Sequence, residues 1–239
     1  MVESGSRRLS SRGTAVKSAL LRIAGIALVM LCAFSGTHAF AQAARGHVAT
    51  PTAAPAAQRT VLVMGDSLSA AYGLSTAQGW VALTAQKIAK QKPGWRVVNA
   101  SISGETTAGG AARIAAELKR HRPAVVVIEL GANDGLRGLP IAQTRANLAK
   151  MIAASKTANA KVLLIGMRLP PNYGPDYTRG FERTFRELAQ QQKTAFLPFL
   201  LQPIALDDRA FQADRLHPVA AAQPKLRDHV WSALVPLLN

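Results

Sequence analysis

The chain has 239 residues, of which 49% are hydrophobic, 29 are basic and 13 are acidic, giving a net charge of +16. This hydrophobic fraction excludes a disordered protein and is enough for a sizeable core, in one large domain or two small ones. The single cysteine excludes a disulfide-stapled scaffold and a metal site built from several cysteines.

The first 41 residues have the three parts of a secretory signal peptide. Basic residues such as Arg7 and Arg22 come first, an apolar run of 12 residues from Ile23 to Phe34 follows, and Ala39-Phe40-Ala41 offers a small-x-small cleavage site. The run is shorter than the roughly 20 residues that span a bilayer, so we expect no transmembrane helix. We predict cleavage after Ala41, export by the Sec route and a periplasmic or secreted protein.

Residues 42–57 form an Ala- and Pro-rich stretch with little bulky apolar surface, which predicts a flexible leader. Residues 58–239 are expected to form one domain. Cleavage would remove Cys32 and leave 24 basic and 12 acidic residues. The exported protein would then need no disulfides in an oxidising compartment.

From Arg59 onward, short apolar runs alternate with amphipathic stretches, which predicts an α/β domain with a parallel sheet and helices on both faces. The five predicted strands are Thr60–Met64, Trp95–Asn99, Ala124–Leu130, Lys161–Met167 and Thr194–Leu197. Helical patterns cover about residues 79–92, 108–121, 140–157, 176–191 and 218–237. In the fourth of these helices, a stripe of Tyr177, Phe181, Phe185 and Leu188 is more typical of core than of a binding surface.

Polar or glycine-rich segments follow the strands, at the sheet edge where such folds bind ligands. They are Gly65-Asp66-Ser67-Leu68-Ser69, Ser101-Ile102-Ser103-Gly104-Glu105, Gly131-Ala132-Asn133-Asp134, the stretch from Arg168 to Gly174, and Asp214-Arg215-Leu216-His217. A serine hydrolase needs a nucleophilic hydroxyl, a histidine base, a carboxylate and donors for the developing oxyanion. These segments supply all four.

The place of each residue after its strand suggests its role. Ser67, at the expected start of a helix, is the candidate nucleophile, His217 the general base and Asp214 the carboxylate that holds the imidazole. The N–H groups of Ser67 and Gly104 and the side-chain amide of Asn133 are candidate oxyanion donors.

Each of these residues also has a structural alternative. Ser67 would serve as a helix N-cap, Gly104 as a turn glycine and the Asn133 segment as a turn. Asp214 would cap the last helix, with Pro218 in its first turn and the neighbouring histidine a bystander. Their joint placement at successive strand ends favours the hydrolase interpretation.

The segments GDSLS, SISGET, GAND and DRLH, in this order, resemble the four sequence blocks of the GDSL, or SGNH, hydrolases, over about residues 59–235. The resemblance implies a flavodoxin-like three-layer α/β/α sandwich with a five-stranded parallel sheet, and no metal. It places the family's nucleophile on Ser67, its oxyanion donors on Ser67, Gly104 and Asn133, and its acid and base on Asp214 and His217. Because Ser69 replaces the last glycine of GxSxG, the nucleophile elbow of α/β-hydrolases is not expected.

This resemblance implies hydrolysis of carboxylic esters and thioesters, of the acyl-CoA, lysophospholipid or aryl ester type, through an acyl-enzyme. It also suggests an apolar acyl groove, for which the candidate lining residues are Leu68, Tyr72, Leu74, Thr106, Leu169, Pro170 and Tyr173. The alternative is that the prolines and Tyr173 only stiffen a loop. A short-chain arylesterase or carbohydrate O-deacetylase of the same fold, and a lipid-binding protein without catalysis, are the competing functions.

No cofactor or metal is expected, because His47, His121 and His229 show no ligand spacing with His217 or with one another. The positive charge would attract an anionic membrane surface transiently or an acidic thioester. The basic residues are scattered rather than gathered in a dense run, so a solvated surface is favoured and a nucleic-acid partner is not expected. We expect a monomer acting on small molecules.

Overall fold

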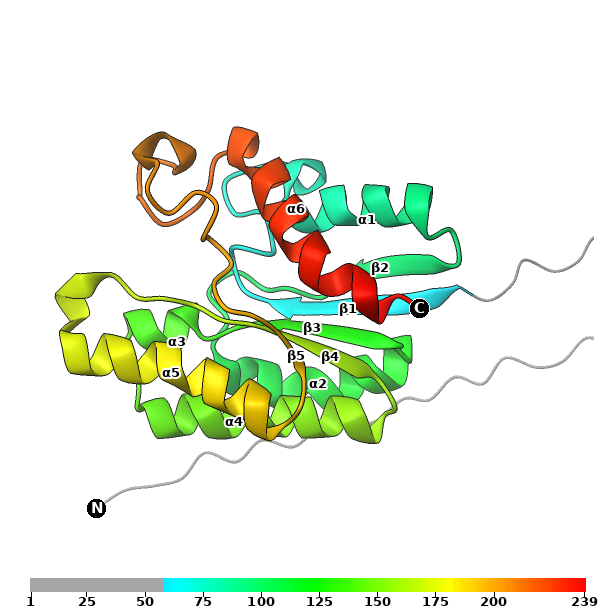
Figure 1. The fold of residues 1–239 in the computed structure, drawn as a ribbon, viewed down its shortest axis with the longest axis horizontal. Helices are drawn as coiled ribbons and strands as arrows, with labels where there is room; N and C mark the ends of the chain where they lie inside the picture. Colours follow the sequence, from blue (N-terminus) through cyan, green and yellow to red (C-terminus); the bar gives the residue numbers. More distant parts are fainter. Residues whose placement is uncertain (1–57) are drawn as a thin grey trace, which may run out of the picture. The chain divides into compact units, whose positions relative to one another are not determined.

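The structure is a computed structural model that describes residues 58–239. The predicted signal peptide (residues 1–41), with Cys32, and the predicted leader (residues 42–57) lie outside the described residues. The described part has helices on both faces of a five-stranded sheet (Figure 1). The predicted α/β/α fold class is confirmed.

All five strands of the sheet are parallel, in the order β2-β1-β3-β4-β5. Their bounds are β1 Arg59–Gly65, β2 Trp95–Asn99, β3 Val125–Glu129, β4 Lys161–Ile165 and β5 Ala195–Leu197. The chain adds β2 on one side of β1 and then β3 on the other, so the strand order reverses at β1. Gly65 is in register with Glu129, which brings the ends of β1 and β3 level. A crevice at such a reversal is the usual ligand site of an open α/β sheet.

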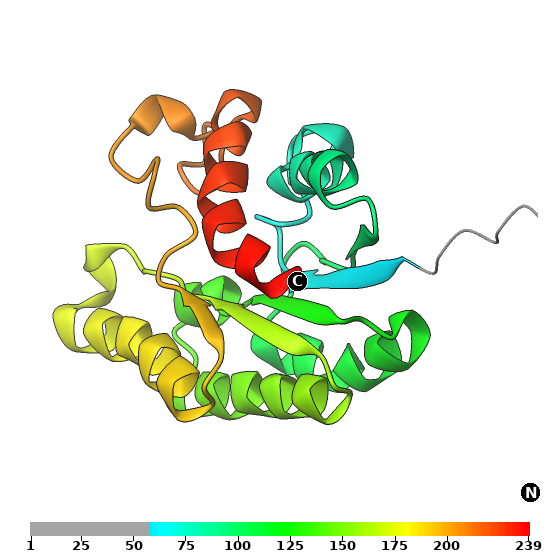
Figure 2. The same ribbon diagram turned by 45° about the vertical axis from the view of Figure 1, so that its right-hand side comes forward.

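Helices α1 and α6 cover one face of the sheet, and α2, α4 and α5 cover the other (Figures 1 and 2). The helices are α1 Trp80–Gln91, α2 Thr107–His121, α3 Ala132–Leu136, α4 Ile141–Thr157, α5 Pro175–Gln191 and α6 Gln223–Leu234. Short 3-10 turns cover Thr76–Gln78, Pro171–Tyr173, Asp208–Ala210, Ala220–Ala222 and Val235–Leu237. Within residues 58–239, no helix has both the length and the apolar character that a membrane crossing requires.

The core lies between the sheet and the two helix layers. Residues 61–64 of β1 and 125–128 of β3 are unbroken hydrophobic runs, as strands covered on both faces are, and Leu62 and Val127 are completely buried. In α5, Phe181 and Phe185 are buried and their rings meet edge to face, with centroids 5.2 Å apart. The interpretation of this helix stripe as core is confirmed, although Tyr177, at its start, is only half-buried.

Two helices differ from the sequence-based prediction. The sequence patterns do not predict α3, because Ala-Asn-Asp-Gly-Leu is typical of a turn. The last helix is expected from about Pro218, but α6 begins at Gln223. Pro218 instead pairs with Phe211 in an isolated antiparallel bridge, which holds the chain extended before the helix.

Candidate active site

Ser67 lies in a tight turn directly after β1, and the expectation that it starts a helix is wrong. The turn is closed by hydrogen bonds from the N–H of Ala70 to the Asp66 carbonyl (2.9 Å) and from the N–H of Tyr72 to the Ser67 carbonyl (3.1 Å). The Asp66 side chain also accepts from the N–H of Leu68 at 3.1 Å. The next α-helix begins only at Trp80. Ser67 is therefore held by the turn and is not a helix N-cap.

His217 and Asp214 lie in a second turn, which follows β5 by a long connection. The Phe211–Pro218 bridge and a 2.7 Å hydrogen bond from the N–H of Gln212 to the His217 carbonyl close this turn. One Asp214 carboxylate oxygen accepts from the N–H groups of Leu216 (2.9 Å) and His217 (3.0 Å). Asp214 therefore orders its own turn, and its alternative role as a cap of the last helix is wrong.

The structure brings Ser67, His217 and Asp214 into one hydrogen-bonded row. The Ser67 Oγ lies 2.8 Å from Nε2 of His217, and Nδ1 of the same ring lies 2.6 Å from the second carboxylate oxygen of Asp214. A carboxylate can only accept, so Nδ1 donates to Asp214 and the lone pair of Nε2 faces the serine hydroxyl. The arrangement is that of a serine, its base and the group that orients the base.

Asp214 remains ionised over a wide pH range. The backbone N–H of His217 contributes most to lowering its pKa to about 2, with smaller contributions from the N–H of Leu216 and from the His217 side chain. A carboxylate that stays charged can stabilise an imidazolium whenever the histidine takes a proton.

Tyr72 and Gln212 join the two turns. The Tyr72 ring packs on the His217 ring with centroids 4.4 Å apart, and the Tyr72 carbonyl accepts from Nε2 of Gln212 at 2.9 Å. The same Gln212 amide reaches the Pro218 carbonyl at 3.2 Å. Gln212 had no signal in the sequence, because a single glutamine in a loop predicts nothing about its partners.

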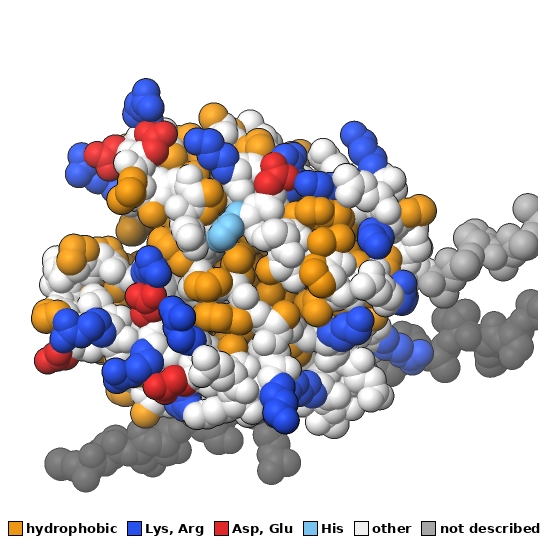
Figure 3. All heavy atoms as spheres, in the orientation of Figure 1, with side chains coloured by type: hydrophobic (Ala, Val, Ile, Leu, Met, Phe, Trp, Pro, Cys, Tyr) orange, Lys and Arg blue, Asp and Glu red, His pale blue; other side chains and the backbone are white. Residues whose placement is uncertain are grey.

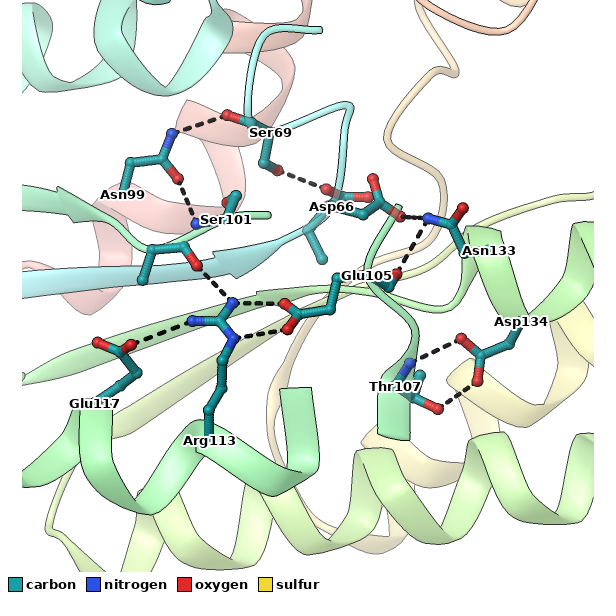
Figure 4. Close-up of polar contacts among 12 residues, drawn as sticks. Asp66, Ser69, Asn99, Ser101, Glu105, Thr107, Arg113, Glu117, Asn133 and Asp134 are labelled. Atoms are coloured by element: carbon teal, nitrogen blue, oxygen red, sulfur yellow. Dashed lines mark hydrogen bonds and ion pairs between the residues drawn. The ribbon is translucent and has the colours of Figure 1, made fainter. Parts of the chain in front are cut away.

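Asn133 lies in α3, with its side-chain amide between the two neighbouring loops (Figure 4). Its Nδ2 donates to the Glu105 carbonyl at 3.1 Å and to the Asp66 carboxylate at 3.3 Å. Two acceptors facing Nδ2 fix the amide orientation, because a flipped amide would set oxygen against oxygen. The amide has two hydrogens, and both already have acceptors. A substrate oxygen that accepts from Asn133 therefore has to replace or share the longer of the two contacts, the one to Asp66.

The other candidate oxyanion donors are backbone N–H groups. Among the described residues, no backbone carbonyl accepts from the N–H of Ser67 or of Gly104. Gly104 lies on an exposed loop with φ +78°, a left-handed conformation that favours glycine. Both groups are thus free of backbone partners, as donors to a substrate must be.

A pair of buried carboxyl groups, Asp66 and Glu129, lies under the nucleophile turn. Ser69 donates to Glu129 at 2.5 Å, and Glu129 is completely buried at the end of β3. Burial raises the pKa of both groups, that of Asp66 to about 6, and the charge of Asp66 raises the pKa of Glu129 further. A side chain at Gly65 would come within 2.6 Å of Ser69 and 2.9 Å of Glu129, which explains the glycine there. Glu129 could have been noticed as the charged residue that ends an apolar strand.

A cavity of about 460 Å³ opens beside the row, and Ser67, Asn133 and His217 line it. Its other lining residues are mostly apolar and come from the Ser67 turn, from α3, from the loop after β4 and from residues 199–217: Leu68, Ala132, Leu136, Met167, Arg168, Leu169, Pro170, Phe199, Leu201, Ala205, Phe211, Arg215 and Leu216. Figure 3 shows hydrophobic side chains in the middle of one face of the molecule, with Lys and Arg side chains around them.

Three of the seven candidate groove residues line the cavity, and four do not. Leu68, Leu169 and Pro170 line the cavity. The other four, Tyr72, Leu74, Thr106 and Tyr173, are not among its lining residues, and Gly104 is not either. Tyr173 lies in the 3-10 turn Pro171–Tyr173 and donates its hydroxyl to the Leu136 carbonyl at 2.9 Å, so it fixes the loop to α3. The apolar residues of 199–217 that line the cavity belong to no predicted helix or strand, which is why the sequence did not point to them.

Among the residues that the structure describes, no three His, Cys, Asp or Glu side chains are grouped so as to hold a metal ion.

A three-layer α/β/α fold with a serine, a histidine and an aspartate in one row at the sheet edge is that of a serine hydrolase, and Ser69 in place of the last glycine of GxSxG sets it apart from the α/β-hydrolases. The model of the GDSL-like lipase/acylhydrolase family matches residues 63–223 of this chain, and the chain belongs to that family.

Several characterised proteins are similar over most of the chain. Esterase TesA of Pseudomonas aeruginosa is 54% identical over 183 residues, which are 77% of this chain and 91% of that protein. Thioesterase 1/protease 1/lysophospholipase L1 of Escherichia coli is 42% identical over 184 residues, 77% of this chain and 87% of that protein. A crystal structure of the psychrotrophic esterase EstA from Pseudoalteromonas, inhibited by monoethylphosphonate, superposes with a TM-score of 0.73 and 40% sequence identity. The match covers 76% of this chain and all of the EstA chain.

Proposed function

We propose that this chain, a serine hydrolase of ester bonds by its family and relatives, acts through a Ser67-His217-Asp214 triad and an acyl-enzyme. The observation that carries the proposal is the hydrogen-bonded row of these three side chains at the mouth of an apolar cavity. The related EstA is inhibited by monoethylphosphonate, whose tetrahedral phosphorus resembles the intermediate that forms when a serine attacks an ester carbonyl.

In the proposed reaction, Nε2 of His217 takes the Ser67 hydroxyl proton as Oγ bonds to the carbonyl carbon. The carbonyl electron pair moves to the oxygen, where the N–H groups of Ser67 and Gly104 and the Asn133 amide stabilise it. When the intermediate collapses, the bond to the leaving alkoxide or thiolate breaks and His217 protonates that group. Water then repeats the sequence on the acyl-enzyme, releasing the acid and restoring the hydroxyl.

The size and lining of the cavity favour substrates with an acyl chain longer than acetyl. Its lining is mainly apolar, and its volume, about 460 Å³, exceeds what an acetyl group fills. The charged side chains along it are the guanidinium groups of Arg168 and Arg215, while no carboxylate lines it. This combination suits esters and thioesters that carry an acyl chain and an anionic leaving part, such as lysophospholipids and acyl-CoA.

The test is hydrolysis of p-nitrophenyl esters from two to sixteen carbons by residues 42–239, beside the variant Ser67→Ala. We expect activity that disappears in Ser67→Ala, by a factor of about 10⁴ or more in kcat, with an optimum at medium or long chains. A variant as active as the parent protein would contradict Ser67 as the nucleophile. An acetyl optimum would favour the short-chain arylesterase or O-deacetylase alternative. Failure of a fluorophosphonate to label Ser67 would favour the lipid-binding alternative.

The proposal includes export, monomeric action and transient attraction to anionic membranes. It is supported by the order of basic, apolar and Ala-x-Ala segments in residues 7–41 and by the excess of basic residues in the rest of the chain. N-terminal sequencing of the exported protein is expected to begin at Gln42.

A further inference from the structure

An ion pair outside the cavity holds the loop that follows β2. Arg113, in the second turn of α2, binds Glu105 with two parallel contacts, Nε to one carboxylate oxygen at 2.7 Å and Nη2 to the other at 2.5 Å. The Glu105 side chain is 6% exposed and that of Arg113 is 19% exposed. Paired, bidentate and largely shielded from water, this contact belongs to the stronger class of charged hydrogen bonds.

Arg113 binds both ends of the same loop. Its Nη2 also donates to the carbonyl of Ala100, where the loop begins, and Glu105 is where the loop ends (Figure 4). Within the loop, the N–H of Glu105 donates to the Ile102 carbonyl at 3.1 Å. The remaining guanidinium nitrogen, Nη1, lies 3.3 Å from Glu117, one turn along α2. Arg113 therefore fixes residues 100–105 to the rigid helix.

Two of the candidate oxyanion donors depend on this loop. Gly104, whose N–H has no backbone acceptor, precedes Glu105 directly, and the Glu105 carbonyl accepts from the Asn133 amide at 3.1 Å. A Cβ placed on Gly104 would meet nothing within 4 Å, so local packing does not hold the glycine in place. The contacts of the loop therefore set the position of Gly104. They include the Arg113–Glu105 ion pair and a 3.1 Å hydrogen bond from Nη2 of Arg137 to the Gly104 carbonyl.

We propose that Arg113 is a positioning residue that acts through Glu105 to set the Gly104 N–H and the Asn133 amide for the oxyanion. The inference rests on the proposed serine-hydrolase mechanism. The guanidinium does not line the cavity, so it acts on the transition state only through the loop that carries Gly104 and accepts from Asn133. Hydrogen bonding to Glu105 raises the pKa of Arg113, in accord with a tightly held pair.

The experiment compares Arg113→Met, Arg113→Lys and Glu105→Gln with the parent protein on one p-nitrophenyl ester. We expect kcat to fall about 10- to 100-fold in Arg113→Met with KM changed less than about twofold, because oxyanion donors act mainly in the transition state. Arg113→Lys is expected to restore only part of the rate, since an ammonium cannot make the paired contact. Arg113→Met and Glu105→Gln together are expected to cost little more than Arg113→Met alone.

A transition-state analogue separates positioning from general loosening of the fold. The Ki of a trifluoromethyl ketone, which forms an oxyanion on the serine, is expected to rise by the factor that kcat/KM falls, while inhibition by a product carboxylate is unchanged. Arg145→Met is the matched control, because Arg145 binds Gln191 and Glu187 on the helical layer away from the cavity. It is expected to leave kcat within twofold of the parent.

Three outcomes would overturn the inference: an unchanged kcat in Arg113→Met, equal losses in Arg145→Met, or a KM increase that accounts for the whole effect. If Arg113→Met does not fold, Glu105→Gln carries the test, with the same analogue and an expected loss of about 3- to 10-fold in kcat. The outcome of Ser67→Ala tests the mechanism separately. An inactive Ser67→Ala beside a fully active Arg113→Met would reject the positioning role alone.

Discussion

The two sides of the cavity are built differently. Ser67 and Asn133 follow β1 and β3, next to the buried carboxyl groups of Asp66 and Glu129. We call this the strand-end side. His217 and Asp214 belong to residues 199–217, which we call the distal segment, where the chain has turns and one short 3-10 helix but no strand. The turn and helix of the first side are anchored directly at strand ends of the sheet, whereas the second side is positioned by the hydrogen bonds of turns far from any strand.

Two aspartates show what this difference does to charge. Asp66, on the strand-end side, is fully buried, and burial raises its pKa to about 6. Asp214, on the distal segment, is exposed, and the N–H of His217 contributes most to holding its pKa at about 2. Solvent together with backbone N–H groups therefore keeps Asp214, the aspartate of the proposed triad, ionised, while burial at the sheet edge disfavours a charge on Asp66.

The largest effect is expected from Asp214→Asn. The asparagine oxygen can still accept from the turn N–H groups, but its NH2 would face Nδ1 of His217 and force the proton onto Nε2. The imidazole would then have no lone pair for Ser67, and we expect kcat to fall about 10³- to 10⁴-fold with the fold intact. Steady-state kinetics and circular dichroism measure the two. A loss below tenfold would show that the distal segment does not need its carboxylate.

The next effect concerns stability and is expected from Asp66→Asn. Since the folded pKa of Asp66, about 6, lies above the usual 3.8, the folded state holds this proton more tightly than the unfolded chain. Below about pH 3.8, Asp66 is protonated in both states and does not lower the free energy of unfolding. As the pH rises from 3.8 to 6, the free energy of unfolding decreases, and above pH 6 it is lower by the full amount, about 3 kcal/mol.

Urea unfolding at pH 4 and pH 7.5 checks this expectation. The free energy of unfolding of Asp66→Asn, taken relative to that of the parent protein, is expected to increase by up to about 3 kcal/mol from pH 4 to pH 7.5. Asp214→Asn is the matched control. The pKa of Asp214 is lowered, so its stabilisation is complete above pH 3.8 and is lost only as the pH falls toward 2. A parallel pH response of the two variants would mean that burial does not distinguish the aspartates.

The smallest effect tests whether the distal segment also selects the acyl chain. Ala205 lines the cavity, and Ala205→Phe would fill part of it. We expect kcat/KM for long-chain esters to fall about tenfold while that for two-carbon esters changes little. Leu206→Phe is the control, because Leu206 is fully exposed and does not line the cavity. Equal losses at all chain lengths would place the acyl chain elsewhere.

The strand-end side was largely predictable from the sequence. Apolar runs such as TVLVM and AVVVI define strands, and the parallel topology places the residues after them at one edge. Ser67 and Asn133 were found by that logic alone, and the family prediction is confirmed. The helix expected at Ser67 was wrong because Ala71 takes a left-handed conformation with φ +61°, and the N–H of Tyr72 closes a single turn on the Ser67 carbonyl.

The distal segment was predictable only at its catalytic pair. Asp214 and His217 stand three residues apart, so local spacing relates them, but Phe199, Ala205 and Phe211 reach the cavity along an irregular path that has no periodicity. The same holds for long-range partners such as Gln212 and Tyr72, which are 140 residues apart. Tertiary contacts of loops leave no periodic trace in a sequence.

The sequence separation of Ser67 and His217, 150 residues, has a consequence for the order in which the enzyme is made. A ribosome completes β1 and the nucleophile turn early, but the base and its carboxylate are among the last residues added. No partly synthesised chain that ends before residue 217 can carry the triad. Recovery of catalytic activity therefore reports the closing of a loop of 150 residues, and it measures complete folding more strictly than secondary structure does.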